Sequence, residues 1–304
     1  FPRAQLAIFA FDVQVPLTLT LALEANNVET VACSERPISI VNEMQPFAVG
    51  TLLTADPDMS RRALTSRSLA IKSATSIGMW RTDLLAIYGK EHPHPLWWSG
   101  TSISRDRVVV LLHPIDVGDD WGGNPLLTSV NVARHFLEDI HQLARQHPMA
   151  AFVVGGKSDG WMDHPGLRDT VERLNGTVNI KLSTDYARLN ETYRLCAHSP
   201  LVIAKYTSMV DELLAFGTSC LVHDYSHNVS GVCRRLCPHL DGDFWLENEA
   251  QFRSVTAQYF REQRNSAPDG CSPTEEDLSP LANGHVRSRA KWSFVSLIKG
   301  TSGD

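Results

Sequence analysis

Short apolar runs alternate with longer segments of helical period through most of this 304-residue sequence, a pattern typical of βαβ units around a parallel sheet. In the second half, runs rich in valine, isoleucine and leucine predict strands at 108–112, 150–154, 177–182, 200–204 and 219–223. Helices are expected between them at 129–146, 167–174, 186–197 and 208–216. The first third continues less clearly, with strands expected at 6–11, 30–33, 52–53 and 69–71 and a helix at 17–26. The sequence therefore predicts an α/β protein with two Rossmann-like, doubly wound parallel-sheet domains.

A turn-rich stretch separates the two halves. Residues 88–107 break both the strand period and the helix period, so we expect a domain boundary there. The prediction is a partial amino-terminal domain at 1–100, a complete sheet domain at 101–262, and a polar loop with a last helix at 263–304. Because the chain starts without methionine inside an apolar stretch, we also expect part of the first domain to lie outside these residues.

Composition and charge narrow the function classes. With 43% hydrophobic and 20% charged residues the chain is an ordinary globular protein, and no apolar run reaches the ~18 residues that cross a bilayer. The net charge of −6 argues against a surface built for nucleic acid, although it permits a local basic cleft. Six scattered cysteines and the lack of a recognisable signal peptide favour a cytoplasmic location, whereas sequons at Asn175, Asn190 and Asn228 leave a secreted alternative open.

Polar and cationic residues follow the predicted strands of the second domain. Gly155 and Gly156 permit a close backbone approach at the end of one strand, and Lys157 after them can neutralise a phosphate. Thr207 and Ser208 follow another strand and open a helix, where free N–H groups and hydroxyls suit an anion. Ligands of parallel sheets gather at such ends, so we expect a negatively charged ligand in this domain.

The other strand ends and one helix position extend this candidate site. His113 and Asp116 follow the first strand of the domain, and Asp224 follows the last. Glu212 lies four residues after Ser208 on the same helix face, within reach of a sugar or ribose hydroxyl. The alternative is structural, with Ser208 as a helix cap and Glu212 in solvent. No Walker A loop and no GxGxxG, HExxH or CxxC motif is present, which removes the usual support for several hydrolase and dehydrogenase functions.

Two weaker groups of residues complete the candidates. Histidines and cysteines crowd between His223 and His239, but a second cysteine or histidine pair at zinc-finger spacing is missing, so we predict no metal site. In the first domain, Glu35 and Arg36 directly follow the strand 30–33. Glu35 is a candidate general base and Arg36 a candidate ligand for an acceptor anion, and a local Glu–Arg ion pair is the alternative.

The segment 200–224, PLVIAKYTSMVDELLAFGTSCLVHD, resembles the carboxyl-terminal domain of GT-B glycosyltransferases. In that family, an aliphatic strand, a Ser or Thr, a Glu and a Gly before the next strand bind the phosphate of a nucleotide sugar. The resemblance covers about residues 108–250. Transferases of bacterial surface polysaccharides, of the Kdo and polyol-phosphate types, are similar in pattern.

The resemblance implies roles for individual residues. Lys157, Thr207 and Ser208 would hold the donor phosphate, and Glu212 would bind ribose or sugar hydroxyls. His113 would contact the phosphate or the base. Glu35 would act as the general base in the first domain.

The implied activity is transfer of a sugar from a nucleotide sugar to a polysaccharide, glycolipid or other glycan acceptor. Cationic groups and a helix N-terminus would stabilise the leaving phosphate, so the reaction would need neither a metal nor a further cofactor. Such acceptors also imply peripheral association with the inner face of a membrane. Two alternatives stay open: a nucleotide-sugar epimerase of the UDP-GlcNAc 2-epimerase type, and a non-catalytic module that binds nucleotide sugars.

Overall fold

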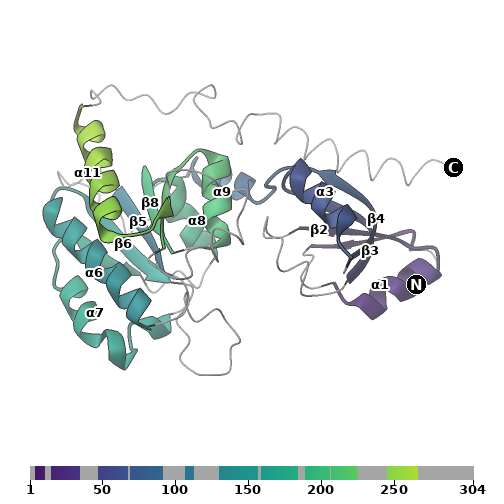
Figure 1. Cartoon of the computed structure of the whole chain (residues 1–304), viewed down its shortest axis with the longest axis horizontal. Helices are drawn as coiled ribbons and strands as arrows, with labels where there is room; N and C mark the ends of the chain where they lie inside the picture. The colour runs from purple at the N-terminus through teal and green to yellow at the C-terminus, as the bar shows by residue number, and fades with distance from the viewer. Residues whose placement is uncertain are drawn as a thin grey trace. The chain divides into compact units, whose positions relative to one another are not determined.

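The computed structural model describes residues 4–10, 15–34, 47–67, 69–91, 107–112, 130–156, 159–183, 189–205, 207–224 and 245–265 (Figure 1). These residues divide into two compact units, 4–81 and 82–265, each with its own parallel sheet. The predicted boundary after residue 100 falls in a segment outside the described residues. Before that segment, helix α4 (Thr82–Tyr88) packs against helices of the second unit.

In the first unit, four described strands lie side by side in chain order. They are β1 (Leu6–Phe9), β2 (Glu29–Cys33), β3 (Phe47–Thr54) and β4 (Leu69–Ser76), all parallel. Helix α1 (Leu17–Ala25) joins β1 to β2, and α3 (Pro57–Thr65) joins β3 to β4. Asp56 caps α3 by accepting a 2.8 Å hydrogen bond from the Met59 N–H, and Pro57 follows as its first residue. Parallel pairing and short helical crossovers confirm the α/β prediction for this unit.

The second unit holds a six-stranded parallel sheet in the order β10-β9-β8-β5-β6-β7. Its strands are β5 (Arg107–Leu112), β6 (Ala151–Gly156), β7 (Ile180–Ser183), β8 (Leu201–Ala204), β9 (Ser219–His223) and β10 (Trp245–Leu246). Counted along the chain from β5 and read from the β7 edge, the order is 3-2-1-4-5-6, the strand order of the Rossmann fold. The prediction of a doubly wound sheet is therefore confirmed for this unit.

Helices cover both faces of this sheet. They are α6 (Val130–Gln146), α7 (Arg168–Asn175), α8 (Leu189–Ala197), α9 (Ser208–Phe216) and α11 (Glu249–Asn265). Figure 1 shows α6, α7 and α11 together on one face and α8 and α9 on the other. Helix α6 buries an apolar stripe against the sheet, since Phe136, Ile140 and Leu143 are each at most 2% exposed. Burial of each such side chain stabilises the fold by about 1.5–3 kcal/mol.

A buried asparagine fixes the turn between α6 and β6. The Asn179 side-chain amide donates hydrogen bonds to the carbonyl oxygens of Ala144, His147 and Ala150, at 2.9–3.1 Å. These carbonyls lie at the end of α6 and in the following turn, where the helix can no longer satisfy them. Asn179 therefore ties the carboxyl end of α6 to the start of β7.

The carboxyl-terminal prediction lies mostly outside the described residues. Helix α11 ends at Asn265, so the polar loop and last helix expected at 263–304 are described only over 263–265. Within the described part of the chain, no helix combines the length and the apolar character needed to cross a bilayer.

Candidate functional site

The strand order of the second unit reverses between β5 and β8. From β5 the chain continues to β6 and β7 on one side, then returns to β8, β9 and β10 on the other. In open parallel sheets, ligands bind outside the carboxyl ends of the strands at such a reversal. The described strands of the first unit lie in chain order and contain no reversal. The carboxyl ends of β5 and β8 therefore mark the candidate site.

Strand register brings four residues level at these ends. Leu112, the last residue of β5, pairs with Gly156 of β6. The pairing of β5 with β8 and of β8 with β9 places Lys205 and His223 in the same cross-strand row. Because residues level on neighbouring strands point to the same face, this terminal row faces α6. A lysine and a histidine thus continue a row that begins with apolar residues.

Lys205 is a buried cation at the reversal. It is 1% exposed and directly follows β8, and its backbone N–H donates a 3.0 Å hydrogen bond to the Leu111 carbonyl. Lysine is rarely buried unless its charge is compensated, because desolvation of an ammonium group is costly. Lys205 therefore places a cationic side chain, whose charge also lowers the pKa of His223, at the point of the sheet where an anionic ligand is expected.

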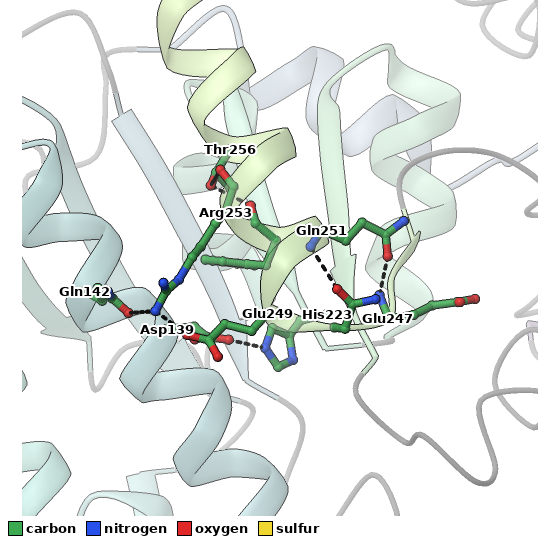
Figure 2. Close-up of polar contacts among 10 residues, drawn as sticks. Asp139, Gln142, His223, Glu247, Glu249, Gln251, Arg253 and Thr256 are labelled. Atoms are coloured by element: carbon green, nitrogen blue, oxygen red, sulfur yellow. Dashed lines mark hydrogen bonds and ion pairs between the residues drawn. The ribbon is translucent and has the colours of Figure 1, made fainter.

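His223 forms a buried pair with Asp139 of α6 (Figure 2). Its Nε2 lies 2.9 Å from Asp139 Oδ2, and the ring contacts Phe136 and Phe252 with centroid separations of 4.9 and 5.7 Å. Burial lowers the pKa of His223, and the charge of Lys205 lowers it further, while the hydrogen bond to Asp139 opposes both. The ring is therefore neutral at pH 7, with its Nε2–H donating to the carboxylate.

Helix α11 is held over this pair by a second set of polar contacts. The Arg253 guanidinium donates to Gln142 Oε1 of α6 at 3.1 Å and also contacts Glu249 of its own helix (Figure 2). These contacts are exposed, so each adds little stability by itself. Together with Phe252 they position α11 across α6 and the end of β9.

The N-terminus of α9 lies directly beyond Lys205. Thr207 is the N-cap, and its hydroxyl oxygen accepts a 3.4 Å hydrogen bond from the Met209 N–H. Ser208 is the first residue of the helix, so the capping role predicted for Ser208 is wrong by one residue and belongs to Thr207. The helix still directs its positive dipole end toward the carboxyl edge of the sheet, next to Lys205.

Glu212 is fully buried on α9. Its carboxylate accepts a hydrogen bond from the Tyr193 hydroxyl of α8, and its exposed fraction is 0%. The solvent-exposed position weighed as the structural alternative is therefore wrong. Contact of Glu212 with a ribose or sugar hydroxyl stays a prediction, and it requires the hydroxyl to reach a carboxylate already bound by Tyr193.

The glycine pair is buried at the end of β6. Gly155 pairs with Leu111 on one side and Ser183 on the other, at the centre of three strands. A Cβ atom on Gly156 would lie 3.1 Å from Trp161 Cδ1, so the bare α-carbon lets the indole lie against the strand. Close approach of a ligand to this backbone stays a prediction, and Lys157 lies outside the described residues.

Asp224 completes the described strand ends. It is 7% exposed, and its N–H donates a 2.8 Å hydrogen bond to the Leu246 carbonyl, which fixes the end of β9 beside β10. His113 and Asp116, predicted for the end of β5, lie outside the described residues.

In the first unit, Ser34 directly precedes the candidate base Glu35. Ser34 follows β2, and its carbonyl accepts a 3.4 Å hydrogen bond from the indole N–H of Trp80. Glu35 and Arg36 themselves lie outside the described residues, so their roles stay predictions.

The described segments contain no group of three or more histidine, cysteine, aspartate or glutamate side chains that could hold a metal ion. Of the weighed zinc candidates between His223 and His239, only His223 is described, and it bonds to Asp139.

No protein-family model matches the sequence, and comparison with curated proteins found no match. Solved structures do resemble the chain. One is a protein of Listeria monocytogenes assigned as a UDP-N-acetylglucosamine 2-epimerase, with a TM-score of 0.63 and 12% identity over 99% of this chain and 76% of that chain. Another is the wall teichoic acid polymerase TagF, with a TM-score of 0.56 and 11% identity over 99% of this chain and 74% of that chain.

These likenesses show the fold. The chain has an α/β architecture with two Rossmann-like units of the GT-B type, as the sequence predicts. These neighbours are a wall teichoic acid polymerase and a protein assigned as an epimerase, and at 11–12% identity they do not decide the activity of this chain.

Two residues of the site were not predicted from the sequence. Lys205 directly follows a predicted strand, and its place at a strand end was the available signal. Trp161 gave no signal, because its contact with Gly156 depends on a 3-10 turn, η2 (Asp159–Trp161), that folds back on the sheet. The pairing of His223 with Asp139 joins residues 84 positions apart and is likewise invisible to local patterns.

Proposed function

We propose that this protein is a glycosyltransferase that moves a sugar from a nucleotide-sugar donor to a glycan acceptor. The observation that carries the proposal is the β5–β8 reversal, where buried Lys205 and the N-terminus of α9 converge. The positive dipole end of α9 and the charge of Lys205 suit the phosphates of a nucleotide sugar. The GT-B-type fold supports this choice of ligand class.

The proposed reaction is a displacement at the anomeric carbon of the donor sugar. The acceptor hydroxyl oxygen bonds to this carbon, while the bond from the carbon to the phosphate oxygen breaks. The electron pair of that bond stays on the departing nucleotide phosphate, whose added charge Lys157, Thr207 and Ser208 would stabilise. The hydroxyl proton would pass to the carboxylate of Glu35. Neither a metal nor a further cofactor is part of this scheme.

A nucleotide-sugar epimerase is the second candidate. The observation in its favour is the TM-score of 0.63 with the Listeria monocytogenes protein. An epimerase acts on the donor alone, so it requires no acceptor and leaves a different nucleotide sugar. A non-catalytic module would bind the nucleotide without either reaction.

Nucleotide binding tests the shared part of these proposals. Millimolar UDP, CDP or CMP should raise the thermal midpoint of the wild type, because a ligand that binds only the folded state stabilises it. Lys157→Ala should weaken binding of the active nucleotide about tenfold to a hundredfold, the effect of losing a charge-assisted hydrogen bond. Lys90→Ala removes an exposed lysine that follows α4 and serves as the control. No stabilisation by any of the three nucleotides would sink the donor site.

Product analysis then separates the activities. A transferase releases free nucleotide from a UDP- or CDP-sugar only when a glycan acceptor is added, whereas an epimerase converts the donor without one. In Glu35→Gln we expect nucleotide affinity to persist and turnover to fall by at least about a hundredfold, as for loss of a general base. Unchanged turnover in this variant would remove Glu35 from the mechanism.

A further inference from the structure

Trp161 lies against the carboxyl end of β6. It is 3% exposed and comes from the turn η2, which returns the chain to the sheet after the glycine pair. An added Cβ on Gly156 would meet its Cδ1 at 3.1 Å and its Nε1 at 3.3 Å, so the N–H edge of the indole faces the end of the strand. The Leu112 carbonyl, which ends β5, lies 3.5 Å from the same point.

The indole N–H of Trp161 is buried, and no acceptor for it is present among the described residues. An indole nitrogen can only donate, and buried tryptophans normally find an acceptor because an unsatisfied buried donor costs free energy. Trp161 is well packed in the core beside α6, so poor packing does not account for this donor. Since no described residue accepts from it, this donor is open to an acceptor on a bound ligand.

The place of this donor fits an anion. It lies at the carboxyl ends of β5 and β6, one strand away from the β5–β8 reversal. Lys205 lies on the other side of β5, in the same cross-strand row as Gly156. Adjacent strands are about 4.8 Å apart, so the backbones of Gly156 and Lys205 lie on either side of the end of β5, about 10 Å from each other. A negatively charged group bound at the end of β5 would lie between them.

We infer that the Trp161 indole N–H donates a hydrogen bond to a phosphate oxygen of a ligand bound at the end of β5. The inference rests on the proposed function, for which the ligand is a nucleotide sugar and the oxygen belongs to its phosphates. Within the described part of the free protein the donor has no acceptor, and the ligand supplies one. The N–H therefore contributes to binding and nothing to the stability of the free fold.

Because the N–H is expected to strengthen binding without stabilising the free fold, its removal should affect these two quantities differently. Replacing the Trp161 side chain by its benzothiophene isostere keeps the shape of the indole and exchanges the N–H for sulfur. We expect the affinity for inorganic pyrophosphate and for UDP or CDP, measured by calorimetry, to fall about tenfold. The thermal midpoint without ligand should stay the same or rise. Trp161→Phe also removes the N–H. If this variant folds, it should show the same loss of affinity.

A spectroscopic readout reports on the bond directly. In ¹⁵N-labelled wild type, pyrophosphate should move the Trp161 indole proton signal downfield, while the signals of the other six of the seven tryptophans serve as internal controls. Wild-type affinity in the isostere protein overturns the inference and leaves the proposed function standing. Binding of pyrophosphate that depends on the N–H, with no binding of any nucleotide, upholds the anion site and overturns the proposed function. A wild type that binds none of these ligands overturns both.

Discussion

At the scale of single residues, the buried His223–Asp139 pair predicts how stability depends on pH. Burial and Lys205 hold the pKa of His223 below its usual value of about 6.5, so the unfolded chain binds a proton that the folded chain refuses. The contribution of neutral His223 to the free energy of unfolding is therefore fully present above about pH 6.5. It is lost as the pH falls from there toward the lowered pKa. One proton gives a slope of at most about 1.4 kcal/mol per pH unit.

His223→Gln should flatten this dependence, because glutamine can still donate to Asp139 but does not titrate. The measurement is the free energy of unfolding between pH 5 and 7.5, compared as a slope so that any constant loss of stability cancels. His141→Gln on α6 is the comparison variant: burial and the nearby Arg173 and Arg145 also lower the pKa of His141, but its ring is only partly buried, so we expect a smaller effect on the slope. Equal flattening by both variants would contradict the assignment of the main effect to His223.

The surroundings of the individual site residues were harder to predict from the sequence than the helices and strands. The residue types at the strand ends were predicted because strand ends follow from local apolar runs, and Thr207 lies where expected. The environments of these residues could not be predicted, since Glu212 contacts Tyr193 only when α8 packs on α9. Lys205 is similar, because a sequence does not show that a lysine will be buried.

At the scale of elements, two helix ends offer a matched test of backbone conformation. Gly217 ends α9 with a φ of 90°, whereas Gly176 ends α7 with a φ of −78°. A side chain is disfavoured only at the first angle, so Gly217→Ala should destabilise the fold by about 1–2 kcal/mol. Its thermal midpoint should fall by about 2–8 °C.

Gly176→Ala is the control for this change. Its new Cβ would lie 3.4 Å from the Glu172 carbonyl oxygen, an ordinary contact, so we expect a change within about 0.5 kcal/mol. Equal losses in the two variants would show that the left-handed conformation of Gly217 is not what terminates α9.

The elements themselves were largely predictable. Helix α9 and strand β9 match the expected 208–216 and 219–223, because a capped helix, a glycine and a β-branched run follow one another closely. Strands β3 and β4 are longer than expected, since small and polar residues such as Gly50 and Ser73 interrupt their apolar runs. Helix α11 and the two-residue β10 were missed, the latter because it is too short to have a period.

At the scale of the whole molecule, the parallel α/β class follows from the alternation of strands and helices, but the order of the strands does not. Right-handed crossovers allow β8 to return to either edge of the growing sheet. Only its pairing with β5, through residues such as Val109 and Val202, creates the reversal at which the site forms. The candidate site is thus a product of tertiary structure, although its residue types are legible in the sequence.

This location leads to a prediction about the two units. Every described group of the proposed donor site belongs to the second unit, which has its own continuous core beneath α6, α7 and α11. Residues 82–274, produced alone, should therefore fold cooperatively and bind UDP or CDP with a dissociation constant within about threefold of that of the whole chain, a difference of about 0.7 kcal/mol. Circular dichroism and calorimetry provide the measurements. Affinity that is lost in a folded second unit would place part of the donor site in the first unit, whereas retained affinity leaves the first unit free to supply the acceptor side and the base.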